Sequence, residues 1–176
     1  IKIIVKGKIP KGIFAKDIIL YIVKKIKADG ATYKAIEFCG PVIGQLGMDG
    51  RFTICNMVVE MGAKAGFMPQ DKKTMAWLRQ RVSGRVKISP VTPDEDAFYK
   101  EVIEFDISRL APQVACPHSV DNVTSVGELK NIKINEAFLG TCTNARLSDF
   151  KIAAKILKSR KVSPSVKLII APGSRA

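Results

Sequence analysis

The sequence has few of the residues from which metal-binding or disulfide-linked scaffolds are built. It contains one histidine among 176 residues and four cysteines, Cys39, Cys55, Cys116 and Cys142. The cysteines lie far apart without a CxxC pair, and one histidine cannot complete the usual zinc-finger ligand set. The sequence therefore predicts neither a zinc finger nor a disulfide framework, and a reducing, cytoplasmic compartment is expected.

Long hydrophobic runs are also missing. The longest strongly apolar stretch covers residues 18–23, whereas a membrane-spanning helix needs about 20 apolar residues. No membrane contact is therefore expected. No secretory signal peptide opens the chain, and Ile1 in place of methionine predicts that the natural start lies upstream.

Acidic residues are in the minority, with 16 against 29 basic ones and a net charge of +13. The basic residues concentrate in residues 1–30 and 146–176, and neither region matches a nucleic-acid-binding module or interleaves aromatic residues with the charges. Because basic charge alone gives only non-specific association, a solvated basic surface is predicted and nucleic acid is not an expected partner. A content of 47% hydrophobic and 26% charged residues is that of a globular protein.

Residues 47–62 predict a glycine-rich start followed by one helix over residues 49–61, with Gly62 as its end. On such a helix Asn56 and Glu60 stand at i and i+4 and share a face. Their apolar neighbours would hold the Glu60 carboxylate in hydrophobic surroundings, which makes it a candidate for proton transfer. A solvent-facing Asn–Glu pair is the alternative.

The last fifty residues predict a βαβ unit with strands over residues 134–140 and 166–171 and a helix over residues 147–158. Cys142 then lies at the carboxyl end of a strand, just before a helix N-terminus whose partial positive charge favours a thiolate. Cys142 is therefore a candidate ligand or nucleophile, with a buried, inert cysteine as the alternative. No suitably placed histidine supports a Cys–His hydrolase.

Together these patterns predict an α/β fold in two parts. A mixed α/β domain is expected over residues 1–125, and the βαβ unit over residues 126–176 is expected to open a doubly wound parallel sheet. His118, in an irregular segment, is expected to be structural or exposed. Further helices are expected over residues 15–27, 68–81 and 94–99, and further strands over residues 2–5, 31–38 and 101–107.

Five runs of the sequence carry a family resemblance. KGIFAKDIILYIV, MDGRFTICNMVVEMGAKAG, APQVACPH, FLGTCTNARLSDF and APGSR, in this order and spacing, resemble the large subunit of 3-isopropylmalate dehydratase and homoaconitase in the aconitase superfamily. The resemblance covers essentially the whole chain, and its ACPH segment is similar to the archaeal-type branch.

The resemblance implies an aconitase-like fold and a hydro-lyase that uses a [4Fe-4S] cluster. Such an enzyme dehydrates a hydroxy-di- or tricarboxylate and rehydrates it at the neighbouring carbon. By motif position, Cys142 would be one of three cluster ligands. Asn56 would lie near the cluster, and Glu60 would interact with the substrate hydroxyl or water at the open iron. Cys142 is accordingly expected to point toward Asn56 and Glu60.

The resemblance also implies that this sequence is a central fragment. The other two cluster cysteines of the family form a CxxC downstream of APGSR, and its His and Asp motifs lie upstream of Ile1. Cys39, Cys55 and Cys116 do not match ligand positions, so this fragment alone is expected to hold no intact cluster and to be inactive. The small subunit, a separate chain, would supply the catalytic serine and part of the substrate selection.

Three functions stay open. The favoured substrate is 2-isopropylmalate, in leucine biosynthesis, because that pathway is the more widespread destination of this subunit type. Homocitrate or homoaconitate, in the lysine or coenzyme B pathway, is the alternative within the same enzyme class. A basic, RNA-binding module on an aconitase-like fold is the alternative from a different class.

Overall fold

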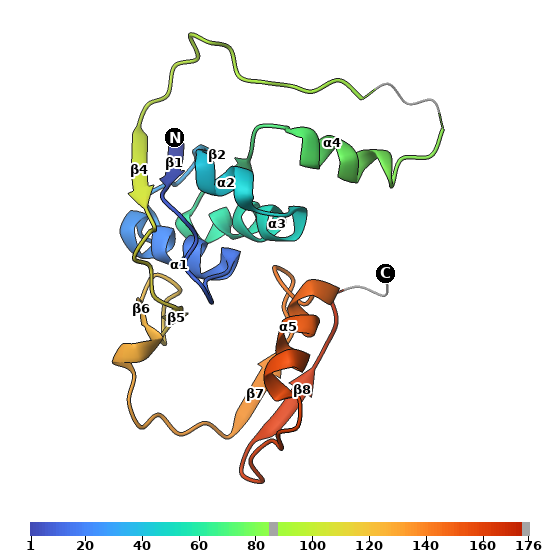
Figure 1. Cartoon of the computed structure of the whole chain (residues 1–176). Coiled ribbons are helices and arrows are strands. Elements are labelled where there is room, and N and C mark those ends of the chain that lie inside the picture. Colours follow the sequence, from blue (N-terminus) through green and yellow to red (C-terminus); the bar gives the residue numbers. More distant parts are fainter. Residues whose placement is uncertain (85–87, 174–176) are drawn as a thin grey trace. The chain divides into compact units, whose positions relative to one another are not determined.

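The computed structural model of the chain describes residues 1–84 and 88–173 (Figure 1). The chain divides into two compact units, Ile1–Glu128 and Leu129–Ala176. Within the described residues, no helix has the length and apolar character that a membrane span requires.

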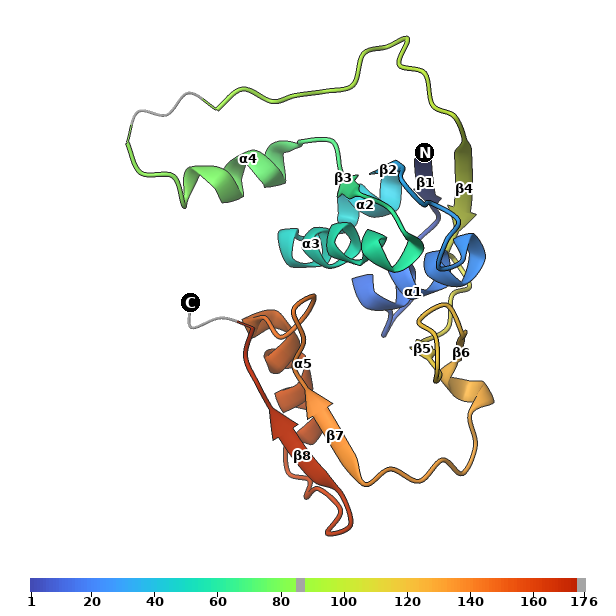
Figure 2. The ribbon, with the colours of Figure 1, turned by 180° about the vertical axis from the view of Figure 1, so that it is seen from behind.

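The first unit is built on a four-stranded parallel sheet. Its strands are β1 (Lys2–Lys6), β2 (Ala35–Cys39), β3 (Ala65–Phe67) and β4 (Val102–Asp106), in the order β3-β2-β1-β4. Figure 2 shows β3 and β4 at opposite edges of this sheet. The chain thus winds one way from β1 to β3 and then returns past β1 to form β4, as in doubly wound sheets. The predicted α/β fold class is confirmed.

The core is formed by one face of the sheet, the helix α1 (Ala15–Ile26) and apolar residues of the segment 42–61. Alternate side chains of the strands, Ile3, Val5, Ile36, Phe38 and Phe105, are buried. Four residues at helical spacing on α1, Ile18, Ile19, Ile22 and Val23, are 0% exposed. The lysines at the end of α1, Lys24 and Lys25, are less buried and suit the negative end of the helix dipole. The predicted amphipathic helix over residues 15–27 is therefore confirmed, apart from its last residue.

The connection from β2 to β3 contains α2 (Pro41–Gln45), α3 (Met48–Asn56) and the 3₁₀ helix η1 (Met57–Met61). The prediction of a single α-helix over residues 49–61 is wrong, because α3 ends at Asn56. The β-branched Val58 and Val59 favour α-helix weakly. Gly62, at φ 77°, donates its N–H to Val58 and Val59 and so tightens the last turn.

The connection from β3 to β4 contains α4 (Lys72–Arg79), and residues 88–101 of this connection form neither helix nor strand. The helix predicted over residues 94–99 is wrong. Only a turn forms there, in which Ala97 donates its N–H to the Asp94 carbonyl. The next residues run extended toward β4, and the hydroxyl of Tyr99 donates to the buried Glu37 carboxylate in the middle of β2. This long-range bond favours the extended conformation at Tyr99 over the helix predicted for residues 94–99.

The first unit ends in a small hairpin and a short helix. Strands β5 (Gln113–Ala115) and β6 (Val123–Ser125) pair in antiparallel fashion, and η2 (Val126–Glu128) follows. The hairpin packs on α1.

The second unit is the predicted βαβ unit. β7 (Glu136–Leu139) pairs in parallel with β8 (Lys167–Ile170), and α5 (Leu147–Leu157) connects them. This prediction is confirmed. Phe138 and Ile170 are 58% and 56% exposed, and no residue of α5 is buried. The unit by itself therefore covers little of its apolar surface.

Candidate functional site

Asn56 and Glu60 lie at the end of α3 and in η1. Asn56 is the last residue of α3 and is exposed, and Glu60 is half-buried. Four residues along an α-helix turn a side chain by about 40° from its starting direction, whereas four residues of 3₁₀ helix turn it by about 120°. Because the helix type changes at Asn56, the i, i+4 spacing no longer guarantees that the two side chains share a face.

The apolar residues around this pair anchor the segment. Ile54 and Met61 are 0% exposed, and Met57 and Val58 are 2% and 4% exposed. The segment is thus fixed in the core by these residues, whereas Asn56 is exposed and Glu60 is half-buried. A small polar ligand can approach them from solvent, and the amide and the carboxylate offer it hydrogen-bond donors and acceptors.

Cys142 lies in a tight polar turn after β7. The backbone N–H of Asn144 donates to Thr141 Oγ1 over 2.9 Å, and the hydroxyls of Thr141 and Thr143 are 3.0 Å apart. Gly140 allows a close approach before this turn, because a Cβ there would stand 2.4 Å from the Ala171 carbonyl oxygen. Cys142 itself is exposed. The turn therefore presents the thiol at the carboxyl end of the parallel strands, as predicted.

The helix N-terminus is used by other residues. Residues 143–146 separate Cys142 from the first residue of α5, Leu147. Asp149 Oδ2 accepts the backbone N–H of Arg146 over 2.9 Å, and its Oδ1 accepts from the side-chain amide of Asn144 over 3.3 Å. Cys142 thus lies shortly before the start of α5, as predicted, and the N-terminus of the helix is capped by the Asp149 carboxylate.

The remaining cysteines differ from Cys142. Burial raises the pKa of the Cys39 thiol and raises that of Cys55 to about 11, although Lys2 and Arg51 act against these shifts. Both side chains therefore stay protonated at neutral pH, and thiols bind metals poorly. Cys116 is half-buried and His118 is exposed. Among residues 1–84 and 88–173, no three His, Cys, Asp or Glu side chains gather as a metal ion would require.

The candidate residues divide between the two units. Asn56 and Glu60 belong to the first unit, and Cys142 belongs to the second. That Cys142 points toward Asn56 and Glu60 stays a prediction.

Sequence reasoning missed a charged cluster beside this site. Arg51, one of the first residues of α3, is 3% exposed and binds the carboxylate of Asp71 with two guanidinium nitrogens. The sequence held one signal for it, since Arg51 is charged yet stands next to the apolar residues of a helix. Its partner, Asp71, lies 20 residues further along the chain, and no local pattern connects the two.

Comparison with known proteins agrees with this architecture. The aconitase family (aconitate hydratase) matches residues 1–130 and 127–176. The chain belongs to the aconitase family. The resemblance seen in the sequence is thereby confirmed.

Several relatives of this aconitase-family chain carry more specific names. A "3-isopropylmalate dehydratase large subunit" from Elusimicrobium minutum is 52% identical over 99% of the chain and 41% of the relative. A "3-isopropylmalate dehydratase large subunit 1" from Thermotoga maritima is 48% identical over 99% of the chain and 42% of the relative. A "Probable methanogen homoaconitase large subunit" from Methanosarcina mazei is 46% identical over 98% of the chain and 43% of the relative. The chain thus spans about two fifths of the length of these relatives.

Proposed function

We propose that this chain is part of the large subunit of a hydro-lyase that isomerises 2-isopropylmalate to 3-isopropylmalate by dehydration and rehydration, in leucine biosynthesis. The observation that carries the proposal is the match of the whole chain to the aconitase family, together with relatives of that name at 52% and 48% identity. A homoaconitase large subunit is the second candidate, because a relative so named is 46% identical over 98% of the chain. The RNA-binding alternative rests on the net charge of +13 alone, which gives only non-specific association.

In this proposal Cys142 contributes one thiolate to a [4Fe-4S] cluster. Such a cluster, when bound, supplies a Lewis-acidic iron for the substrate hydroxyl. The exposed thiol on the turn after β7 fits a ligand role, since a cluster must reach it. Residues 129–176 contain no second cysteine. The other ligands would come from parts of the whole protein outside this sequence, so the isolated chain would hold no intact cluster and would be inactive.

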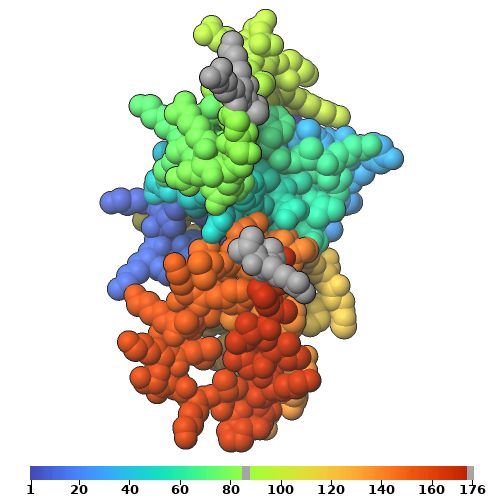
Figure 3. Space-filling model, turned by 90° about the vertical axis from the view of Figure 1, so that its right-hand side faces the viewer, coloured from blue at the N-terminus to red at the C-terminus, as the bar shows by residue number. Residues whose placement is uncertain are grey.

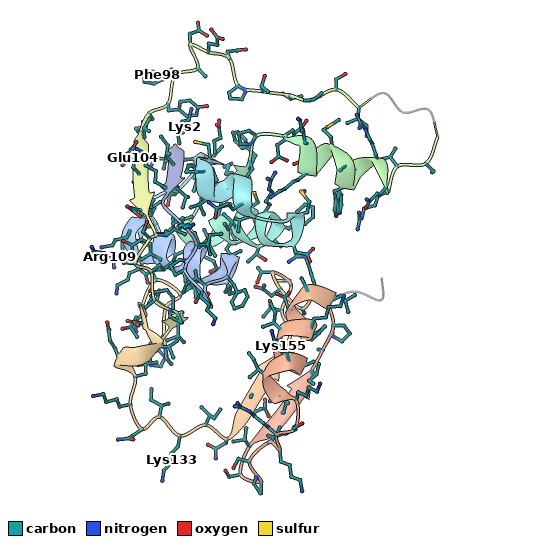
Figure 4. All side chains as sticks on the ribbon, in the orientation of Figure 1. Lys2, Phe98, Glu104, Arg109, Lys133 and Lys155 are labelled. Carbon is teal, nitrogen blue, oxygen red and sulfur yellow. The ribbon has the colours of Figure 1, made fainter. Side chains whose placement is uncertain are left out.

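Asn56 and Glu60 would act on the substrate itself. The Glu60 carboxylate would accept or return a proton at the reacting hydroxyl or water, and the Asn56 amide would hold a substrate oxygen by donating a hydrogen bond. The net charge of +13 would attract a dicarboxylate over distance. Lysines such as Lys133 and Lys155 contribute to this charge (Figure 4).

The small subunit of the dehydratase would be a separate partner chain and would complete the site. The protein would work in the cytoplasm, where reducing conditions keep its four cysteines free, as they are in the structure.

The test uses the full-length large subunit with its small subunit, reconstituted anaerobically with iron and sulfide. Turnover of 2-isopropylmalate at a kcat/KM at least tenfold above that for homocitrate would support the first candidate, and the reverse ratio would support the second. Cys142→Ser is expected to lose the visible absorbance of the cluster, whereas the control Cys116→Ser retains it. An intact cluster and full turnover in Cys142→Ser would refute the proposed ligand role.

A further inference from the structure

The start of α4 is held to the rest of the first unit by charge and hydrogen bonds. No residue of α4 is buried, and Figure 3 shows α4, in light green, on the surface of the first unit. Arg51 Nη1, from α3, donates to Asp71 Oδ1 over 2.9 Å and to Thr74 Oγ1 over 3.0 Å, and Nη2 donates to Asp71 Oδ2. We call Arg51, Asp71 and Thr74 the Arg51 clasp.

The clasp also reaches the chain just before α3. Arg51 Nε donates to the Leu46 carbonyl over 3.3 Å, and Leu46 follows α2 directly. Lys73 adds a separate contact, because its Nζ donates to the carbonyls of Gly44 and Gln45 over 2.6 Å and 3.1 Å. The end of α2, the start of α3 and the start of α4 therefore meet at the Arg51 side chain.

The geometry of the clasp is fixed by its hydrogen bonds. Asp71 caps α4 by accepting the Thr74 backbone N–H over 3.0 Å while it holds the guanidinium. The hydrogen bonds from the Arg51 guanidinium hold the pKa of the Asp71 carboxyl well below its usual range. The pair thus stays ionised at neutral pH. A planar guanidinium bound through two nitrogens fixes orientation as well as distance, which a lysine cannot do.

We infer that Arg51 is a positioning residue that sets the direction of α3 and so places Asn56 and Glu60. The inference rests on the proposed function of these two residues. Arg51 lies less than two helical turns before Asn56, and η1 follows α3 without a break. The apolar residues of α3 and η1 fix one side of the segment in the core, and the Arg51 clasp fixes its beginning. With both anchors in place, neither Asn56 nor Glu60 can shift by rotation of α3.

The kinetic test uses the full-length large subunit with its small subunit in the reconstituted state. Arg51→Lys keeps the charge but removes the two-nitrogen contact, and Asp71→Asn removes the anion. Because a displacement of about 1 Å at reacting groups can cost about 100-fold in rate, both are expected to lower kcat about tenfold or more and to change KM less than about threefold. Thr74→Val, which removes one acceptor, is expected to cause a smaller loss in the same direction. Lys72→Met, at the neighbouring exposed position of α4, is the matched control and should leave kcat within about twofold.

A mutant cycle separates positioning from general support of the fold. If Arg51 acts through Glu60 and Asn56, adding Arg51→Lys to Glu60→Gln or to Asn56→Ala lowers kcat by less than about twofold further. If Arg51→Lys lowers kcat by its full factor in both the Glu60→Gln and the Asn56→Ala variants, the inference is wrong. Wild-type kcat in both Arg51→Lys and Asp71→Asn would also overturn it. If instead Glu60→Gln and Asn56→Ala themselves keep the wild-type kcat, the proposed function of the pair fails and the inference fails with it. If kcat falls in Glu60→Gln and Asn56→Ala but not in Arg51→Lys, only the inferred role of Arg51 is refuted.

Discussion

The carboxylate of Asp17 accepts the backbone N–H of Gln113 over 2.8 Å and so joins α1 to the β5–β6 hairpin. Its other oxygen accepts the backbone N–H of Phe14 over 2.9 Å at the start of α1. Asp17 is only 9% exposed, so the loss of its side chain leaves two N–H donors without this acceptor. One carboxylate therefore serves both as helix cap and as tie to the hairpin.

Asp17→Ala is expected to lower the free energy of unfolding by about 3 kcal/mol, from lost capping and from unsatisfied donors. Asp17→Asn keeps one acceptor oxygen and should cost about half as much. Urea unfolding measures both, with the exposed Asp96→Ala as a control that should change stability little. Equal stability of Asp17→Ala and Asp96→Ala would show that the tie contributes nothing.

Gly140→Ala tests the close approach behind the Cys142 turn. The added Cβ would stand 2.4 Å from the Ala171 carbonyl oxygen, so the strands β7 and β8 must shift apart where they end. A loss of about 1–3 kcal/mol in unfolding free energy is expected for such overpacking. Gly127→Ala is the matched control, since its nearest neighbour would be Ser125 Oγ at 3.8 Å. Thermal unfolding that does not distinguish the two variants would contradict the prediction.

Local periodicity explains which parts of the fold could be predicted. The apolar spacing of α1 and the strand–helix–strand pattern of residues 134–171 are short-range signals, and both elements formed as predicted. The end of α3 at Asn56 was not predicted, because Gly62 indicates where the helical segment ends but not that its last five residues, Met57–Met61, form a 3₁₀ helix. The helix predicted over residues 94–99 does not form, because only a turn is found there.

The same distinction holds for the candidate site. The place of Cys142 in a turn after a strand could be predicted because a strand end and a turn are local features. Arg51 and Asp71 were missed because a bond between residues 20 positions apart depends on how α3 and α4 pack, which no single window shows.

The hydrogen bond from Tyr99 makes the stability of the fold depend on pH in the alkaline range. Its hydroxyl donates to the buried Glu37 carboxylate, and Lys2 Nζ stands 4.8 Å from the centre of its ring (Figure 4 labels Lys2). The bond to Glu37, with a smaller contribution from burial, raises the pKa of Tyr99 from 10.0 to about 12. The stability from this bond is therefore fully present below about pH 10 and is lost as the pH rises through about 12.

Tyr99→Phe should thus be less stable than the wild type at neutral pH and should lose less stability between pH 10 and 12. Urea unfolding across this range measures the difference, and absorbance at about 295 nm should show that the variant lacks the tyrosine whose pKa is raised to about 12. Tyr33→Phe, at a position 79% exposed, is the control that keeps the wild-type alkaline slope. The same slope in Tyr99→Phe and Tyr33→Phe would contradict the assignment.

Trp77 reports directly on whether α4 stays attached. It is the only tryptophan, and its ring packs edge-on against Phe52 of α3 at 5.2 Å while Arg81 stands 4.1 Å above it. Arg51 holds the pKa of Asp71 low. The stabilisation from the Arg51 clasp is therefore fully present above the ordinary carboxyl pKa of 3.8, and it is lost only as the pH falls through the lower pKa of the folded state. Wild-type Trp77 emission should therefore stay constant from pH 7 to below pH 4.

Asp71→Asn tests this attachment. Its Trp77 emission should be red-shifted already at pH 7, because α4 separates from α3, and the exposed Asp94→Asn should behave as the wild type. Identical emission in all three proteins over the whole range would mean that the Phe52 contact alone holds α4, and that the Arg51 clasp does not.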